Sequence, residues 1–139
     1  MSEESTTPDP LELTHRAYAC LNSRDLDGFF GLIGRSCVYD LSRFDLGIYT
    51  GPEAIRRFYE EWIEPLHEFG VVVDDIKNLG NGVIYAVQLG HRGSSPNFFF
   101  ELGGGVVGVW EHGKLVRMTV YPDIDEARAA AERLAEQRG

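Results

Sequence analysis

Apolar residues in the first half of the chain recur with the spacing of helices. The stretch 9–22 opens with Asp-Pro, a pair that suits a helix start, and then carries Leu and Ala residues four positions apart. The stretch 52–64 carries a stripe of Ile, Phe, Tyr and Trp at helical spacing, and a proline follows it. A shorter segment with one apolar side lies at 25–34. We predict helices at these three places.

The remainder of the chain is patterned as strands. Runs of β-branched and aromatic residues are separated by turn signals such as Gly-Asn-Gly and His-Gly, and short connections of this kind favour antiparallel hairpins. The polar segment 123–139 has the capping Asp and the apolar stripe of a final helix. Strands are expected at 36–42, 69–80, 81–92, 96–111 and 114–122.

Several helices ahead of an antiparallel sheet indicate an α+β fold, with helices gathered on one face of the sheet. The length of 139 residues fits one domain, which we place at 9–139 behind a flexible tail at 1–8. Glycines cluster at 103–108, where they suit the bends of a curved sheet. A curved sheet closed over by helices forms a cone with a cavity.

Composition and charge narrow the range of partners. A net charge of −9 argues against binding to nucleic acid and to anionic membrane surfaces. The N-terminal stretch lacks the basic and apolar regions of a signal peptide, and no apolar run is long enough for a membrane helix. Cys20 and Cys37 have no metal-binding spacing and suit buried thiols in a reducing compartment. We expect a cytoplasmic protein.

One acidic residue stands out in the first strand. Alternation in "SCVYDLS" places Asp40 on the same face as Val38, so if Val38 points into the core, the Asp40 carboxylate does too. A carboxylate among apolar groups would have a raised pKa and could move protons near neutral pH. The alternative is a wet strand end where Asp40 pairs with Arg43 or binds backbone amides.

Four segments in order resemble a known superfamily. They are "LNSRDLDGFFGLI", "CVYDLS", "GPEAIRRFYEEW" and "GKLVRMTVYPD", and they extend over nearly the whole chain. The chain resembles the nuclear transport factor 2 superfamily, and within it the SnoaL-like polyketide cyclases and the ketosteroid isomerases. The resemblance implies a cone-shaped α+β barrel with a mostly antiparallel sheet. This superfamily carries enzymes, ligand binders and scaffolds on one frame, so the resemblance implies a pocket and no single activity.

The resemblance assigns roles to particular positions. "VYDL" matches the motif of the isomerase general base, which implies that role for Asp40, and "AIRRFY" matches a helix that supplies a pocket tyrosine, which implies that role for Tyr59. Ala17 and Val106 stand where the isomerases have oxyanion donors, so steroid isomerisation is not implied. Polyketide cyclases use an Asp late in the sheet, but Asp123 here is expected to cap the last helix.

Alternation along the strand 83–91 adds His91 as a second acid–base candidate, on the same inward face as Tyr85 and Val87. Trp62 lies on the helical stripe and carries a donor that could reach a ligand. The predicted catalytic residues are Asp40, His91 and Tyr59. The predicted ligand-binding residues are Trp62, Phe58, Ala17, Leu21, Tyr85, Val87, Val106, Trp110, Met118 and Val120.

Three functions stay open. The first is a cofactor-free isomerase, cyclase, dehydratase or hydrolase that acts on a small apolar molecule through Asp40. The second is a ligand-binding protein without catalysis. The third is a dimerising scaffold, which a cavity below roughly 300 Å³ would favour, and whose interface would use the outer sheet face with Glu101, Arg117 and Tyr121. We expect a homodimer, and neither a cofactor nor a metal ion.

Overall fold

The computed structural model describes residues 9–64, 68–95 and 98–139. The predicted tail at 1–8 lies outside this range. The helices are α1 (Pro10–Asn22), α2 (Leu26–Phe30), α3 (Pro52–Phe58) with a π-helical turn η3 (Tyr59–Ile63), a 3-10 turn η2 (Ser42–Phe44) and α4 (Ile124–Arg138). The strands are β1 (Ile33–Asp40), β2 (Ile48–Thr50), β3 (Glu68–Gly80), β4 (Val83–Ser95), β5 (Phe98–Glu111) and β6 (Lys114–Tyr121).

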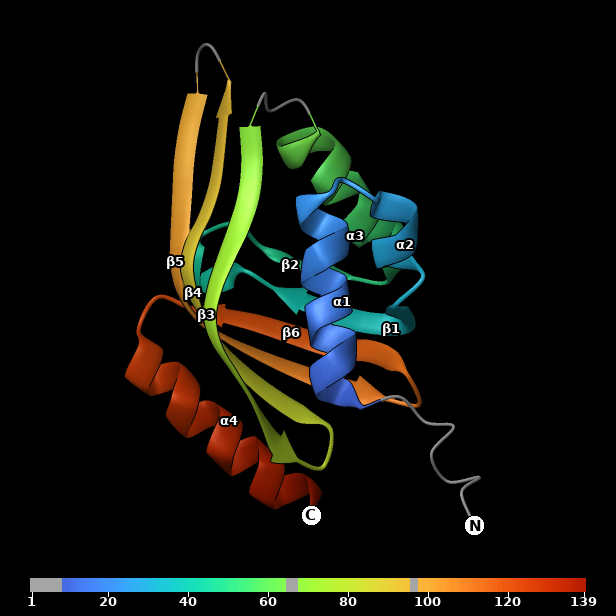
Figure 1. Ribbon diagram of the computed structural model, residues 1–139, viewed down its shortest axis with the longest axis vertical. Coiled ribbons are helices and arrows are strands. Elements are labelled where there is room, and N and C mark those ends of the chain that lie inside the picture. Colours follow the sequence, from blue (N-terminus) through green and yellow to red (C-terminus); the bar gives the residue numbers. More distant parts are fainter. Residues whose placement is uncertain (1–8, 65–67, 96–97) are drawn as a thin grey trace.

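The strands form one six-stranded sheet in the order β2-β1-β6-β5-β4-β3. All neighbours are antiparallel except β1 and β6, which run parallel. The long strands β3 to β5 bend as they pass from α4 at one end of the molecule towards the other (Figure 1). The α+β class is therefore confirmed, and the sheet is strongly curved but open, since β2 and β3 are free edges.

Three element predictions needed correction. The helix expected at 25–34 ends at Phe30, and Ile33 and Gly34 already belong to β1. The segment after the first strand was expected to be a loop, but Ile48–Thr50 pairs with β1 as an edge strand. The helix expected to run through 52–64 changes to π-helical hydrogen bonding at Tyr59. Such local irregularities depend on tertiary packing, which helix propensity does not report.

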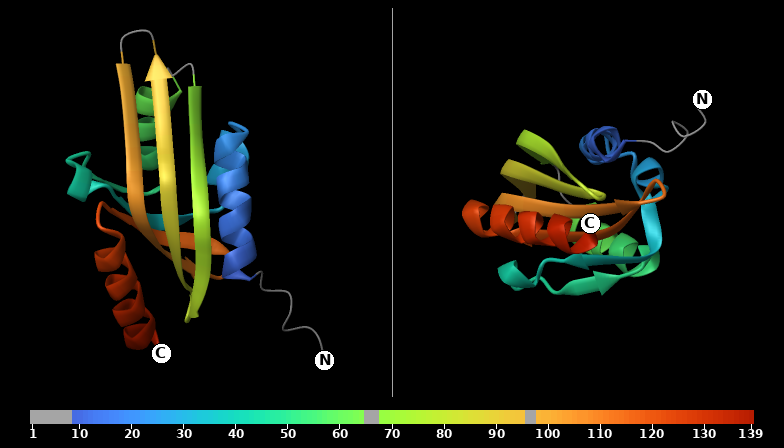
Figure 2. Two further views of the ribbon diagram at one scale, coloured as in Figure 1. Left: turned by 60° about the vertical axis from the view of Figure 1, so that its left-hand side comes forward. Right: turned by 90° about the horizontal axis from the view of Figure 1, so that it is seen from below.

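The sheet is covered on both faces. Helices α1 to α3 lie on one side of the strands and α4 on the other (Figures 1 and 2). The first side carries the larger apolar cluster, to which Leu13, Ile55 and Ile84 belong. The second side carries a smaller cluster around Val83 and Ala131. Both faces of β4 are therefore buried among mainly apolar side chains.

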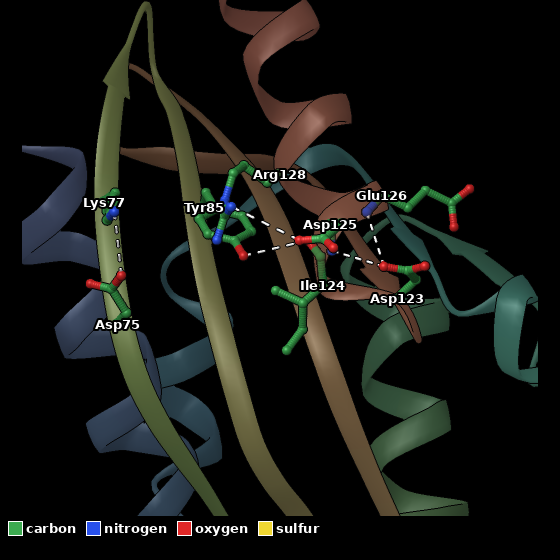
Figure 3. A network of polar contacts seen from close by, with 8 residues as sticks. All are labelled: Asp75, Lys77, Tyr85, Asp123, Ile124, Asp125, Glu126 and Arg128. Carbon is green, nitrogen blue, oxygen red and sulfur yellow. Dashed lines mark hydrogen bonds and ion pairs between the residues drawn. The ribbon is translucent and has the colours of Figure 1, made fainter.

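The C-terminal helix α4 lies very close to the sheet. Its buried face consists of Ala127, Ala131 and Ala135, spaced four residues apart. A methyl group added to Gly105 of β5 would stand only 2.2 Å from the Cβ of Ala127. The small residues of α4 and β5 therefore allow the helix to pack this close to the sheet. As predicted, Asp123 caps the helix and accepts hydrogen bonds from the backbone N–H groups of Asp125 and Glu126 (Figure 3).

Candidate ligand-binding site

An apolar cavity of about 200 Å³ lies between the sheet and helices α1 to α3. Strands β4, β5 and β6 form its floor, α1 one wall, and the segment after β1 together with α3 another. Among the described residues that line it, none carries a carboxylate, an imidazole or a basic group. The lining residues are Thr14, Ala17, Tyr18, Leu21, Phe29, Tyr39, Leu41, Phe44, Leu46, Phe58, Ile84, Ala86, Gln88, Val106, Gly108, Trp110, Leu115, Met118 and Val120.

Most of the predicted ligand-binding positions lie in this lining. Helical spacing had selected residues of α1 and α3, and the resemblance had selected the inward faces of β5 and β6. These positions are Ala17, Leu21, Phe58, Val106, Trp110, Met118 and Val120.

Tyr85 and Val87 lie on the opposite face from the one predicted. Their neighbours Ile84, Ala86 and Gln88 line the cavity, whereas Tyr85 and Val87 belong to the cluster beneath α4. The Tyr85 hydroxyl donates to the Ile124 carbonyl at 3.5 Å, at the start of that helix (Figure 3). Successive side chains of β4 do point to alternate faces of the sheet. Because both faces are buried, however, the sequence pattern does not indicate which of them lines the cavity.

Asp40 is buried but does not line the cavity. Its register neighbour in β6 is Thr119, and it borders a separate hollow of about 400 Å³ together with Arg43, Arg117 and residues of α4. Tyr39, one residue earlier, lines the cavity. The expectation that Asp40 would share the cavity face was therefore wrong, because Asp40 borders the hollow beside α4.

The surroundings of Asp40 also reverse the expected direction of its pKa. Burial raises the pKa of this carboxyl group, but hydrogen bonds from Ser42 and the charges of Arg43 and Arg117 outweigh it and lower the pKa overall. Ser42 donates from its hydroxyl at 2.6 Å and from its backbone N–H at 3.0 Å, while Arg43 and Arg117 lie 3.6 and 3.9 Å from the carboxylate. The Asp40 side chain is therefore an ionised carboxylate that is paired with arginines and bound by Ser42 in a turn. This matches the alternative in which Asp40 pairs with Arg43 or binds backbone amides.

Tyr59 lies behind the cavity wall. It is fully buried, and its hydroxyl forms a hydrogen bond with the hydroxyl of Tyr39, which does line the cavity. Burial raises the pKa of both hydroxyls. The pair therefore stays protonated near neutral pH, and only one of its two hydrogens is needed for the contact between them.

Two other polar contacts lie in the lining. The Trp110 indole Nε1–H donates to the Thr14 hydroxyl at 3.0 Å, and that hydroxyl donates to the Pro10 carbonyl at 2.8 Å. These groups are satisfied within the protein. Gln88 differs, because its Nε2 donates to the Tyr18 hydroxyl at 3.5 Å while its Oε1 has no hydrogen-bond partner among the described residues.

Sequence reasoning missed Gln88. The apolar run 83–89 contains one polar residue, and that residue is Gln88. A lone amide in a strand with two buried faces was the available signal, since buried polar groups are uncommon without a partner or a role.

Two predicted site residues are not placed by the structure. The side chains of Trp62 and His91 fall outside what it describes, although the backbone of His91 pairs with Val71 and Leu102. In the described ranges, no three His, Cys, Asp or Glu side chains gather as metal ligands would. No helix in those ranges has both the length and the apolar character needed to cross a membrane.

A curved open sheet with three helices on one face and a fourth on the other defines a cone-like α+β fold (Figure 1), and it encloses an apolar cavity. Residues 14–118 match the family model described as the SnoaL-like domain. The chain belongs to that family, as its resemblance indicated. No protein with a curated description matches its sequence.

Solved structures show the same fold at low sequence identity. A Δ5-3-ketosteroid isomerase from a Mycobacterium species is 18% identical with a TM-score of 0.70, covering 85% of this chain and 96% of that one. A Mycobacterium tuberculosis protein in complex with estradiol-17β-hemisuccinate is 16% identical with a TM-score of 0.70, covering 85% and 97%. An NTF2-like protein from Burkholderia pseudomallei is 18% identical with a TM-score of 0.68, covering 88% and 96%.

Proposed function

We propose that the protein binds a small, mostly apolar molecule in the cavity beneath α1 to α3. The observation that carries this is the lining, which is apolar over most of its extent and has no charged group among its described residues. Cavities of this composition take ligands through burial of apolar surface, with a few polar groups to orient them.

The cavity volume limits the size of the ligand. The cavity volume of about 200 Å³ is smaller than the roughly 300 Å³ at which drug-sized ligand sites begin. A cavity below that size would also suit the scaffold alternative. An apolar cavity of about 150 Å³ nevertheless binds benzene in another protein. One or two fused rings are therefore the expected scale of the ligand, smaller than the steroid conjugate bound by the Mycobacterium tuberculosis structure.

A cofactor-free enzyme is the second candidate. The observation in its favour is the paired hydroxyls of Tyr39 and Tyr59, because the spare hydrogen of that pair could stabilise a developing oxyanion at the cavity wall. Such an enzyme also needs a proton acceptor. Asp40 points away from the cavity, which leaves His91 as the remaining predicted acid–base residue.

Binding is tested by filling the cavity. Gly108 lines it, and a Cβ added there would meet its nearest atom, in Leu115, at 3.7 Å, so a side chain enters without a backbone clash. We expect saturable binding of 2-naphthol to the wild-type protein by calorimetry. Gly108→Leu should weaken it by about tenfold or more, the equivalent of 1.4 kcal/mol, while the matched control Gly108→Ala should change it much less. Wild-type affinity in a folded Gly108→Leu variant would place the ligand elsewhere and refute the proposal.

Proton exchange separates binding from catalysis. The α-hydrogens of 2-tetralone, a bicyclic ketone of similar size, exchange with D₂O through an enolate that an acid–base enzyme would promote. The binding proposal expects exchange at the buffer rate. Exchange above that rate, lost in both Tyr39→Phe and His91→Gln, would favour the enzyme.

The homodimer is a separate proposal. Of the residues expected at the interface, Arg117 and Tyr121 border the open hollow beside α4, while the side chain of Glu101 lies outside what the structure describes. Such a face can meet its own copy about a two-fold axis. Analytical ultracentrifugation of the wild type and of Arg117→Glu should show a dimer that the substitution weakens. A wild-type monomer at high concentration would contradict it.

A further inference from the structure

The Gln88 Oε1 is the one buried side-chain oxygen or nitrogen that has no hydrogen-bond partner in the described part of the chain. Only 5% of Gln88 is exposed, yet its Oε1 accepts no hydrogen bond. A buried acceptor without a partner destabilises the folded state, because it has lost its hydrogen bonds to water. Apolar neighbours such as Ile84 and Ala86 fill the same face of β4, so an apolar residue would suit this position better for stability alone.

The backbone holds this amide at a defined place in the cavity wall. Gln88 pairs with Gly104 on one side and Val73 on the other, and the strand register shifts immediately beyond it in both pairings. Bulges of this kind bend a strand and redirect its side chains. The amide is therefore set at the bend of the sheet, among the residues that line the cavity.

Tyr18 of α1 completes the polar group. Its hydroxyl accepts from the Gln88 Nε2 at 3.5 Å, and Tyr18 also lines the cavity. Gln88 therefore has an unused acceptor in its Oε1, and the Tyr18 hydroxyl has a hydrogen left to donate. If the amide were turned by 180°, its Nε2 would take the unpaired place instead. A ligand hydroxyl satisfies either arrangement, because it both donates and accepts.

We propose that Gln88, assisted by Tyr18, recognises a hydroxyl group on the ligand, so that the cavity selects a small apolar alcohol or phenol over the parent hydrocarbon. This inference rests on the proposed binding function and names the ligand class. The hydrocarbon would leave the Oε1 unpaired, whereas the hydroxyl would provide its missing partner. The rest of the lining would contribute affinity through apolar contact, equally for both molecules.

The test compares two probes that differ by one hydroxyl, 2-naphthol and naphthalene, on the wild type and on Gln88→Met. Methionine keeps the length of the side chain and removes its amide. The ratio of the naphthalene Kd to the 2-naphthol Kd should fall about tenfold in Gln88→Met, the effect of one net hydrogen bond. The control Val87→Ala lies on the face beneath α4 and should leave the ratio unchanged.

The possible outcomes separate the two proposals. Binding of both probes with the same ratio in the wild type and in Gln88→Met would overturn the role of Gln88 and leave the binding function standing. Binding of neither probe to the wild type would overturn both. Retained naphthalene binding in Gln88→Met would show that the variant is folded. A loss of the preference for 2-naphthol would then result from the missing amide and not from unfolding.

Discussion

Tyr39 and Asp40 are consecutive residues of β1 whose side chains lie on opposite faces of the sheet. Tyr39 lines the apolar cavity and contacts Tyr59, while Asp40 borders the charged hollow with Arg43 and Arg117. Because adjacent residues of a strand point to opposite faces of the sheet, the carboxylate of Asp40 is separated from the cavity.

Asp40→Asn is expected to leave binding in the cavity unchanged. The substituted group lies across the sheet from the lining, so the 2-naphthol Kd should stay within about twofold of the wild-type value, less than 0.5 kcal/mol. Calorimetric titration measures this directly. A tenfold loss of affinity would show that Asp40 acts on the cavity after all and would restore it as a candidate base.

The same substitution should lower stability in a pH-dependent way. The pKa of Asp40 is lowered in the folded state, so its stabilising contribution is complete above the ordinary Asp pKa, near 3.9, and is lost as pH falls through the lower folded value. Asn still accepts from Ser42, and the arginines are partly exposed, so we expect a loss of about 1 kcal/mol at pH 7. Urea unfolding should show this difference shrink below about pH 4. An equal difference at pH 7 and pH 3 would contradict the ion-pair explanation.

The hydroxyls of Tyr39 and Tyr59 should behave as a coupled pair. Removing one by Tyr39→Phe or Tyr59→Phe leaves the other buried without its partner, at a cost of about 1–2 kcal/mol. The double variant removes both groups and should lose less than the sum of the two single losses. Unfolding free energies of the four proteins give the coupling, and strict additivity would show that the hydroxyls do not depend on each other.

Gly105→Ala should be strongly destabilising. The new methyl group would stand 2.2 Å from Ala127 Cβ, which forces α4 away from β5, and overpacking of this kind costs about 1–3 kcal/mol. Gly108→Ala in the same strand is the matched control, since its nearest neighbour would be at 3.7 Å. Adding Ala127→Gly to Gly105→Ala should recover part of the loss, and thermal unfolding would show it. Equal melting temperatures for the two alanine variants would refute the close contact.

Gln88→Met should stabilise the protein without ligand. It removes a buried acceptor that lacks a partner, which is worth about 1 kcal/mol, and the loss of the long 3.5 Å hydrogen bond to the Tyr18 hydroxyl offsets only part of this gain. The Gln88→Leu variant should act in the same direction. A loss of stability in both would show that the amide has a structural role, and it would remove the reason for expecting a ligand to satisfy it.

Local patterns predicted much of the fold. The Asp9-Pro10 start, the cap at Asp123 and the apolar stripe of α3 are decided by neighbours a few residues away, so the sequence alone indicates them. The same is true of α1, whose helical stripe includes Ala17 and Leu21, two residues that line the cavity. A helix in this fold buries one face, and its stripe reports which one.

The sheet is different because α4 covers the face that α1 to α3 leave open. In β4 both Tyr85 and Ile84 are almost fully buried. Because the residues on the two faces are similarly hydrophobic, the sequence pattern does not indicate which face points to the cavity. Only the tertiary structure decided that Gln88 faces the cavity and that Asp40 faces away from it. The sequence by itself determined most of the elements, the helix caps and the α+β class, since these depend mainly on short-range interactions. The chemistry of the pocket depended on which face of each strand the distant helices cover, and that is a long-range property of the folded chain.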